Sequence, residues 1–152
     1  MFKSKTLIGL LVLPALALPM QATAKDRLHL KGSETGTFRL LGPCEGGMTL
    51  EVTGTGHSTK LGRYSGRYRE CFDPATGAVT DGTFTLTAAN GDKVVGTFSG
   101  QARPTDDPAV VAYDDPGVIT GGTGRFADAA GTMTTSGLAN LATGKYSGTI
   151  SG

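Results

Sequence analysis

The sequence predicts an all-β protein, a single eight-stranded antiparallel β-barrel with little helix. Apolar and polar residues alternate with a period of two in many short segments, whereas no segment after the leader sustains the 3.6-residue period of a helix. The chain contains 24 glycines, far above the usual share of roughly 7%. These glycines lie between short runs of Thr, Phe, Val and Leu. This arrangement indicates tight turns between strands rather than a disordered chain. Closure into a barrel would also remove the exposed edges of such Thr-rich strands.

Residues 1–24 are expected to direct export and to lie outside the fold. Lys3 and Lys5 precede an apolar run over residues 7–18, and the segment ends in Ala-Thr-Ala. This order is typical of a cleaved secretory signal peptide. The alternative, a membrane anchor, is disfavoured because the run is short and contains prolines. We therefore expect cleavage after Ala24, a single domain over residues 25–152, a secreted or periplasmic location and no stable membrane insertion.

The first two strands are expected near residues 37–41 and 48–52. Phe38 and Leu40 share one face of the first, and Met48, Leu50 and Val52 share one face of the second. In each strand the opposite face is mainly Thr or charged. One apolar face and one polar face are typical of a strand between a core and water.

The two cysteines, Cys44 and Cys71, are expected to form a disulfide. An even cysteine count in an exported chain favours a bridge. The alternative, a reactive thiol pair, lacks a Cys-x-x-Cys motif and a nearby histidine. In the chain-entropy model, closing a loop of this length stabilises the fold by roughly 3–4 kcal/mol.

The third strand, near residues 64–72, carries the candidate ligand-binding residues. Tyr64 and Tyr68 share one face of this strand, whereas Arg63 and Arg67 share the other. One interpretation places the tyrosines in a filled core and the arginines in solvent. The other places a tyrosine hydroxyl in an apolar cavity, where it orients a ligand. A bulge near residue 62 or 66 would change which side chains point inward.

The fourth and fifth strands, near residues 79–88 and 93–99, add Phe84 and Phe98 to the candidate ligand-binding set. Asn90-Gly91 joins them and predicts a tight hairpin with positive φ at both turn residues. Residues 73–77 predict a turn before the fourth strand. Residues 104–107 and 114–117 predict longer polar connections before the last strands, near 118–120, 132–134 and 146–150.

Residues 121–131 predict a sharp corner between two strands. The corner contains Gly121, Gly122, Gly124 and Gly131, which permit the turn, and Phe126, which is expected to plug the core. A phosphate-binding loop is the alternative. The spacing matches neither the dinucleotide-binding nor the Walker pattern, so no cofactor is expected.

This corner resembles a known motif. Its pattern Gly-Gly-Thr-Gly-x-Phe-x-x-Ala-x-Gly resembles the signature of dirigent proteins and, more loosely, that of allene oxide cyclases. The resemblance implies an eight-stranded antiparallel barrel with an apolar cavity, of the kind found in many small exported bacterial proteins. Ala130 stands where plant dirigent proteins commonly carry arginine, and the motif places none of the families' cavity residues. The resemblance therefore implies the barrel and not the activity.

Composition and spacing disfavour several classes of partner. The formal net charge is +1 and falls to about −1 once Lys3 and Lys5 leave with the leader, so no basic excess is present to bind nucleic acid. His29 and His57 are the only histidines, and neither has a partner at metal-ligand spacing. The acidic pairs at residues 106–107 and 114–115 lack a calcium-loop pattern and are expected in solvated loops. No metal is expected.

Three functions remain open on the sequence. The first is an exported barrel that binds a small apolar or aromatic ligand, which an open cavity would favour and a filled interior would oppose. The second is an isomerase, cyclase or dirigent-like radical-coupling protein, which would need an ionisable group in the cavity. The third is a structural or interaction protein of the cell envelope, which an apolar patch on the outer wall would favour. No catalytic residue is assigned, and the oligomeric state is left open.

Overall fold

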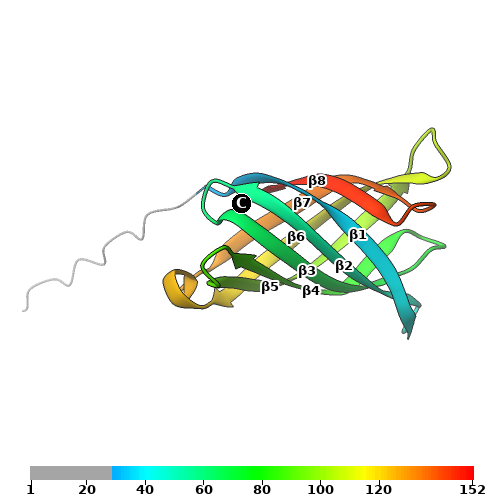
Figure 1. Cartoon of the computed structure of the whole chain (residues 1–152). Coiled ribbons are helices and arrows are strands. Elements are labelled where there is room, and N and C mark those ends of the chain that lie inside the picture. The colour runs from blue at the N-terminus through cyan, green and yellow to red at the C-terminus, as the bar shows by residue number, and fades with distance from the viewer. Residues whose placement is uncertain (1–28) are drawn as a thin grey trace, which may run out of the picture.

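The computed structural model describes residues 29–152, which form a closed barrel of eight antiparallel strands (Figure 1). The predicted fold class is confirmed. The expected signal peptide and its cleavage after Ala24 lie outside the described residues. The elements, in chain order, are β1 (Lys31–Cys44), β2 (Gly47–Ser58), β3 (Gly62–Phe72), β4 (Ala78–Ala88), β5 (Lys93–Pro104), β6 (Val110–Gly122), the short 3₁₀ helix η1 (Gly124–Phe126), β7 (Gly131–Asn140) and β8 (Lys145–Ser151).

Each strand pairs with the strands before and after it in sequence, and β8 closes the barrel by pairing with β1. Leu30 and Gly152 exchange two backbone hydrogen bonds of 2.7 and 2.9 Å just beyond that last pair. Closure leaves no unpaired sheet edge in the described domain. No helix within residues 29–152 is long and apolar enough to cross a membrane.

The alternation expected from the sequence is present in the structure. On β3, Tyr64 and Tyr68 are buried inside the barrel, whereas Arg63 and Arg67 are exposed on its outer wall. The strands extend further than the sequence predicted: β1 has 14 residues where about five were expected from the apolar pattern alone. Backbone pairing continues through residues whose side chains give no clear apolar signal.

The polar connection predicted at residues 114–117 is wrong, because these residues lie within β6. Asp114 faces outward and Asp115 faces the interior, so Asp115 is not a solvated loop residue. The pairing of β5 with β6 passes over Asp115 and Pro116, which accommodates a proline within the strand. Neighbours on both sides of β6 override a local turn signal.

Two further local predictions need correction. The hairpin at Asn90-Gly91 is present, but only Gly91 has positive φ, at 90°. The Asn90 side chain instead accepts a hydrogen bond from the Asp92 backbone N–H at 3.0 Å and donates one to its carboxylate at 2.9 Å. The bulge expected near residue 62 or 66 lies later, between Arg69 and Cys71, where the pairing of β3 with β4 shifts. That shift turns Cys71 into the buried layer.

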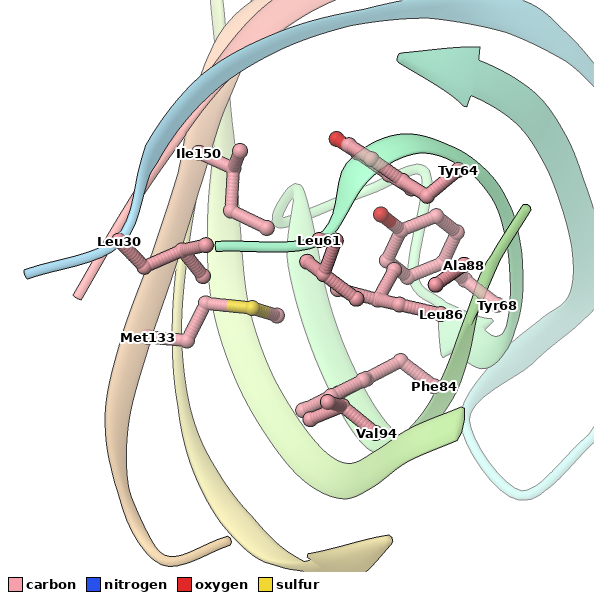
Figure 2. Packing of buried hydrophobic residues seen from close by; sticks show 10 residues of the cluster. All are labelled: Leu30, Leu61, Tyr64, Tyr68, Phe84, Leu86, Ala88, Val94, Met133 and Ile150. Atoms are coloured by element: carbon pink, nitrogen blue, oxygen red, sulfur yellow. The ribbon is translucent and has the colours of Figure 1, made fainter. Parts of the chain in front are cut away.

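The hydrophobic core fills one end of the barrel, which we call the closed end (Figure 2). Figure 1 shows η1 and the start of β1 at this end, and the β1–β2, β3–β4, β5–β6 and β7–β8 connections at the opposite, open end. The core cluster consists of Leu30, Leu61, Tyr64, Tyr68, Phe84, Leu86, Ala88, Val94, Met133 and Ile150. Leu61 and Leu30 precede their strands and cap the barrel from inside.

The corner predicted at residues 121–131 forms part of the closed end. Phe126 packs against the core cluster, and the Arg125 guanidinium lies 4.7 Å from the centre of its ring. Gly124 has φ +57°, and a Cβ there would lie 1.9 Å from an Asp92 carboxylate oxygen. The glycine at this position therefore meets both a backbone and a space requirement.

The predicted disulfide between Cys44 and Cys71 is present, with the two Cα atoms 5.9 Å apart. It lies at the open end and ties the end of β1 to the end of β3. Both cysteines pair with residues at the start of β2. The bridge therefore holds three strands together where the barrel has the least packed core.

Candidate functional site

A cavity of about 320 Å³ occupies the barrel toward its open end. Most of its lining is apolar. The apolar lining residues, which come from all eight strands and two connections, are Phe38, Leu40, Met48, Leu50, Val52, Phe72, Pro74, Val79, Phe98, Ala102, Val111, Ala139, Leu141 and Ile150. Tyr68 and Ile150 belong both to this lining and to the core cluster, so they mark the floor between the filled and the hollow part of the barrel.

Exposed leucines surround the mouth of the cavity. Leu40 is 61% exposed and Leu141 is 49% exposed, yet both line the cavity. Leu41, next to Leu40 on β1, is 42% exposed. The other large exposed apolar residues, Val118 and Leu138, lie far apart along β6 and β7. Apolar exposure is therefore concentrated where a ligand would enter.

Glu34 on β1 is held at the cavity floor by two tyrosines. The Tyr68 hydroxyl donates a 2.8 Å hydrogen bond to one carboxylate oxygen, and the Tyr146 hydroxyl donates to the other. Glu34 is 7% exposed. Cβ atoms at Gly54 and Gly66 would lie 3.1 and 2.9 Å from its carboxylate oxygens. Glycines on the neighbouring strands therefore make room for this group.

Asp115 on β6 is a second carboxyl of the cavity. It is 9% exposed, and its Oδ1 atom is buried without a hydrogen-bond partner. The carboxyl lies over Gly100, where a Cβ would come within 1.8 Å of Oδ1. Burial, and then the negative charge of Asp114, raises the pKa of Asp115 to about 7.

Glu70 on β3 is the third carboxyl in the lining. Burial raises its pKa to about 8, and the charge of Asp115 adds to this shift, which places the two carboxyls near one another. No donor among residues 29–152 forms a hydrogen bond to the Glu70 side chain. Asp115 and Glu70 therefore lack the partners that Glu34 has.

Tyr113 on β6 lines the same cavity as these carboxyls. Burial raises its pKa, and the charges of Glu34, Asp115 and Glu70 raise it further. Its ring meets that of Tyr146 edge to face, with centroids 6.4 Å apart. Burial likewise raises the pKa values of Tyr68 and Tyr146, so the cavity tyrosines are neutral hydroxyls at physiological pH.

No basic side chain lines the cavity in the part of the chain that the structure describes. Over the same residues, no group of three or more His, Cys, Asp or Glu side chains is arranged to hold a metal ion. The polar groups of the cavity thus consist of carboxyls, tyrosine hydroxyls and threonine residues from β7 and β8.

The structure divides the residues proposed from the sequence. Tyr68 and Phe98 line the cavity, with ring centroids 6.1 Å apart. Tyr64 and Phe84 lie in the packed core instead. Arg63 and Arg67 are exposed on the outer wall, so the suggestion that they face a ligand in the barrel is wrong.

Tyr64 keeps one unusual feature within the core. Its hydroxyl is buried beside Gly56 and makes no hydrogen bond of ordinary geometry. Burial, and then the Glu34 carboxylate, raises the pKa of Tyr64. Together with Arg63 and His57 it also borders a more open depression on the outside of the closed end.

The carboxyls of the cavity were not among the site residues predicted from the sequence. Glu34 has the same parity as Phe38, and Glu70 the same parity as Tyr68. Extending the alternation along each strand would have placed both inside the barrel. Asp115 had no such signal, because its neighbours Asp114 and Pro116 are typical of a turn.

Comparisons with models of known protein families, with curated proteins and with solved structures find no match to this chain.

Proposed function

We propose that this barrel binds one small apolar or aromatic ligand in the cavity at its open end, with the tyrosines and carboxyls of the floor orienting the ligand. The observation that supports this proposal is the cavity itself, about 320 Å³ of space with a mostly apolar lining. Small-molecule sites are typically apolar hollows with a few convergent polar groups. An exported location remains part of the proposal and depends on the leader pattern of residues 1–24.

The size of the barrel limits the ligand. An eight-stranded barrel is just wide enough either to be filled by its own side chains or to hold one small ligand. Here the closed end is filled by the protein's own side chains, whereas the open end contains a cavity. The likeness to dirigent proteins and allene oxide cyclases concerns the corner at the closed end, away from the cavity, so it supports the architecture in this proposal and not a substrate.

The test is titration with a neutral fluorescent probe, N-phenyl-1-naphthylamine. Ala139 lines the cavity on β7, whereas Ala112 on β6 lies one register position away and outside the lining. We expect saturable fluorescence enhancement for the wild type and for Ala112→Trp, and at least tenfold weaker binding for Ala139→Trp, whose indole would fill the cavity. Equal binding by the two variants would contradict the proposal.

The second candidate is an enzyme that moves a proton, such as an isomerase. Asp115 and Glu70 favour it, since carboxyls with pKa values of about 7 and 8 in a cavity are suited to general acid–base catalysis. Native mass spectrometry of protein purified from its own host would reveal a bound compound. Conversion of that compound by the wild type, lost in Asp115→Asn with binding retained, would establish catalysis. Unchanged compound after prolonged incubation would exclude it for that ligand.

A further inference from the structure

We infer that the ligand carries a cationic nitrogen on an apolar body, and that this head group meets Asp115 and Glu70 within the cavity. This inference rests on the proposed function, because it names the chemistry of the ligand that the same cavity takes.

The charged groups that face the cavity are all acidic. Carboxyls come from β1, β3 and β6, and phenols from β3, β6 and β8. The cavity-lining positions of the remaining strands hold no titratable side chain; they are Met48, Leu50 and Val52 on β2, Val79 on β4, Phe98 and Ala102 on β5, and Thr135 and Ala139 on β7. An anionic head group would therefore lie against carboxyls with no compensating cation, which is strongly unfavourable in a desolvated site.

The three carboxyls differ in whether their oxygens already accept hydrogen bonds from the protein. Both oxygens of Glu34 already accept tyrosine hydrogen bonds. Asp115, although nine-tenths buried, has an oxygen with no partner. Glu70 is half-buried, and no residue that the structure describes donates a hydrogen bond to its side chain. Buried polar atoms are nearly always satisfied in folded proteins, and an exception requires an explanation. A donor supplied by the ligand satisfies both groups at once.

A cation fits these two groups better than a neutral donor does. Asp115 and Glu70 repel each other when both are ionised, and this repulsion contributes to the raised pKa of Glu70. A positive charge between them would favour the ionised form of each. The aromatic rings of Tyr113, Tyr146 and Phe98 add faces that attract cations. The apolar body of the ligand would then lie against the apolar side chains of the lining, such as Leu50, Val79 and Ile150.

The alternative is a neutral ligand that accepts hydrogen bonds from protonated carboxyls. The two cases differ in proton exchange. A cation drives ionisation of Asp115 and Glu70 and releases protons on binding near pH 7, whereas a neutral acceptor keeps both protonated.

Isothermal titration calorimetry with n-octylamine, 1-octanol and octanoate separates these cases. At pH 7.5 we expect the amine to bind at least tenfold more tightly than the alcohol, and octanoate to bind most weakly. Titrations in two buffers with different ionisation enthalpies should show proton release with the amine only. Lowering the pH from 8 to 6 should weaken amine binding, because Asp115 and Glu70 become protonated, and should leave the alcohol unaffected.

Single substitutions test whether Asp115 and Glu70 are the groups that contact the amine. Asp115→Asn and Glu70→Gln should each reduce amine affinity about tenfold and keep the affinity for 1-octanol, which reports an intact cavity. Asp114→Asn makes the same chemical change at the neighbouring, outward-facing residue and should cause no loss. If Asp115→Asn does not fold, Glu70→Gln still tests the inference.

The two proposals fail separately. The inference of a cationic ligand is wrong if 1-octanol binds as tightly as n-octylamine at pH 7.5, or if 1-octanol binds more tightly at pH 6 than at pH 8. In either case the proposed binding function stands. If neither these probes nor N-phenyl-1-naphthylamine binds the wild type, the proposed function itself fails.

Discussion

At the scale of single residues, the carboxyls inside the barrel differ in how many hydrogen-bond donors they have. Glu34 has two tyrosine donors and glycine neighbours that leave it space. Asp115 has a glycine neighbour that leaves it space but no donor to Oδ1. A satisfied carboxylate stabilises its surroundings, whereas an unsatisfied one reduces the stability of the empty protein. The cavity floor thus combines a structural carboxyl with two that remain available.

The stability of the empty protein should therefore fall as the pH rises from 5 to 8. Asp115 and Glu70 have folded-state pKa values of about 7 and 8, above the usual carboxyl range. The folded protein then holds protons that the unfolded chain has lost, so the stabilisation is complete below the unfolded pKa and is lost as the pH passes through the folded pKa. We expect a decrease of several kcal/mol in the free energy of unfolding, measured by urea denaturation, because a pKa difference of one between the folded and unfolded states corresponds to about 1.4 kcal/mol.

Asp115→Asn should flatten part of this pH dependence, and Asp106→Asn, which changes an exposed loop carboxyl, should not. A wild-type free energy of unfolding that is constant or increases over this range would contradict the raised pKa values.

At the scale of elements, adjacent glycines of the corner have different roles. A Cβ at Gly122 would lie 2.2 Å from the Lys93 carbonyl oxygen and 2.5 Å from that of Phe126. A Cβ at Gly121 would meet nothing within 4 Å. Gly122 is therefore required where β5, β6 and η1 approach one another, whereas Gly121 is not required for space.

Gly122→Ala should lower the free energy of unfolding by about 1–3 kcal/mol, since backbone atoms must move to admit the methyl group. Gly121→Ala is the matched control and should change it by no more than about 0.5 kcal/mol. Chemical denaturation at one pH compares the two variants. Equal effects would show that the corner is not packed as described.

At the scale of the whole molecule, the barrel combines a filled end with a hollow end. Backbone pairing closes the barrel along its whole length, but the hydrophobic core cluster lies at the closed end. The disulfide lies at the other end, beside the cavity. A covalent link there compensates for apolar contacts that the hollow end lacks.

The double variant Cys44→Ser/Cys71→Ser should therefore lose about 2–4 kcal/mol of stability, because its unfolded chain is less constrained. Urea denaturation with and without reductant measures the loss. Reductant should bring the wild type to the stability of the variant and leave the variant unchanged. A wild type that is insensitive to reductant under unfolding conditions would contradict a stabilising bridge.

The class of fold, the disulfide and the corner could all be predicted from local sequence patterns. Period-two alternation assigns each side chain to a face of its own strand, and the spacing of turns limits the number of strands, so these features depend on local chemistry. Tyr68 and Phe98 were accordingly expected inside the barrel and are found there. The identification of Phe126 as a core anchor followed from the same local pattern.

Only the tertiary structure decided which end of the barrel is filled and which groups meet in the hollow end. That outcome depends on the register of eight pairings and on the summed volumes of side chains from every strand, which no single segment contains. The corner of residues 121–131, in contrast, could be predicted from its own glycines and Phe126. Glu34, Glu70 and Asp115 became a site only when β1, β3 and β6 were brought around one cavity.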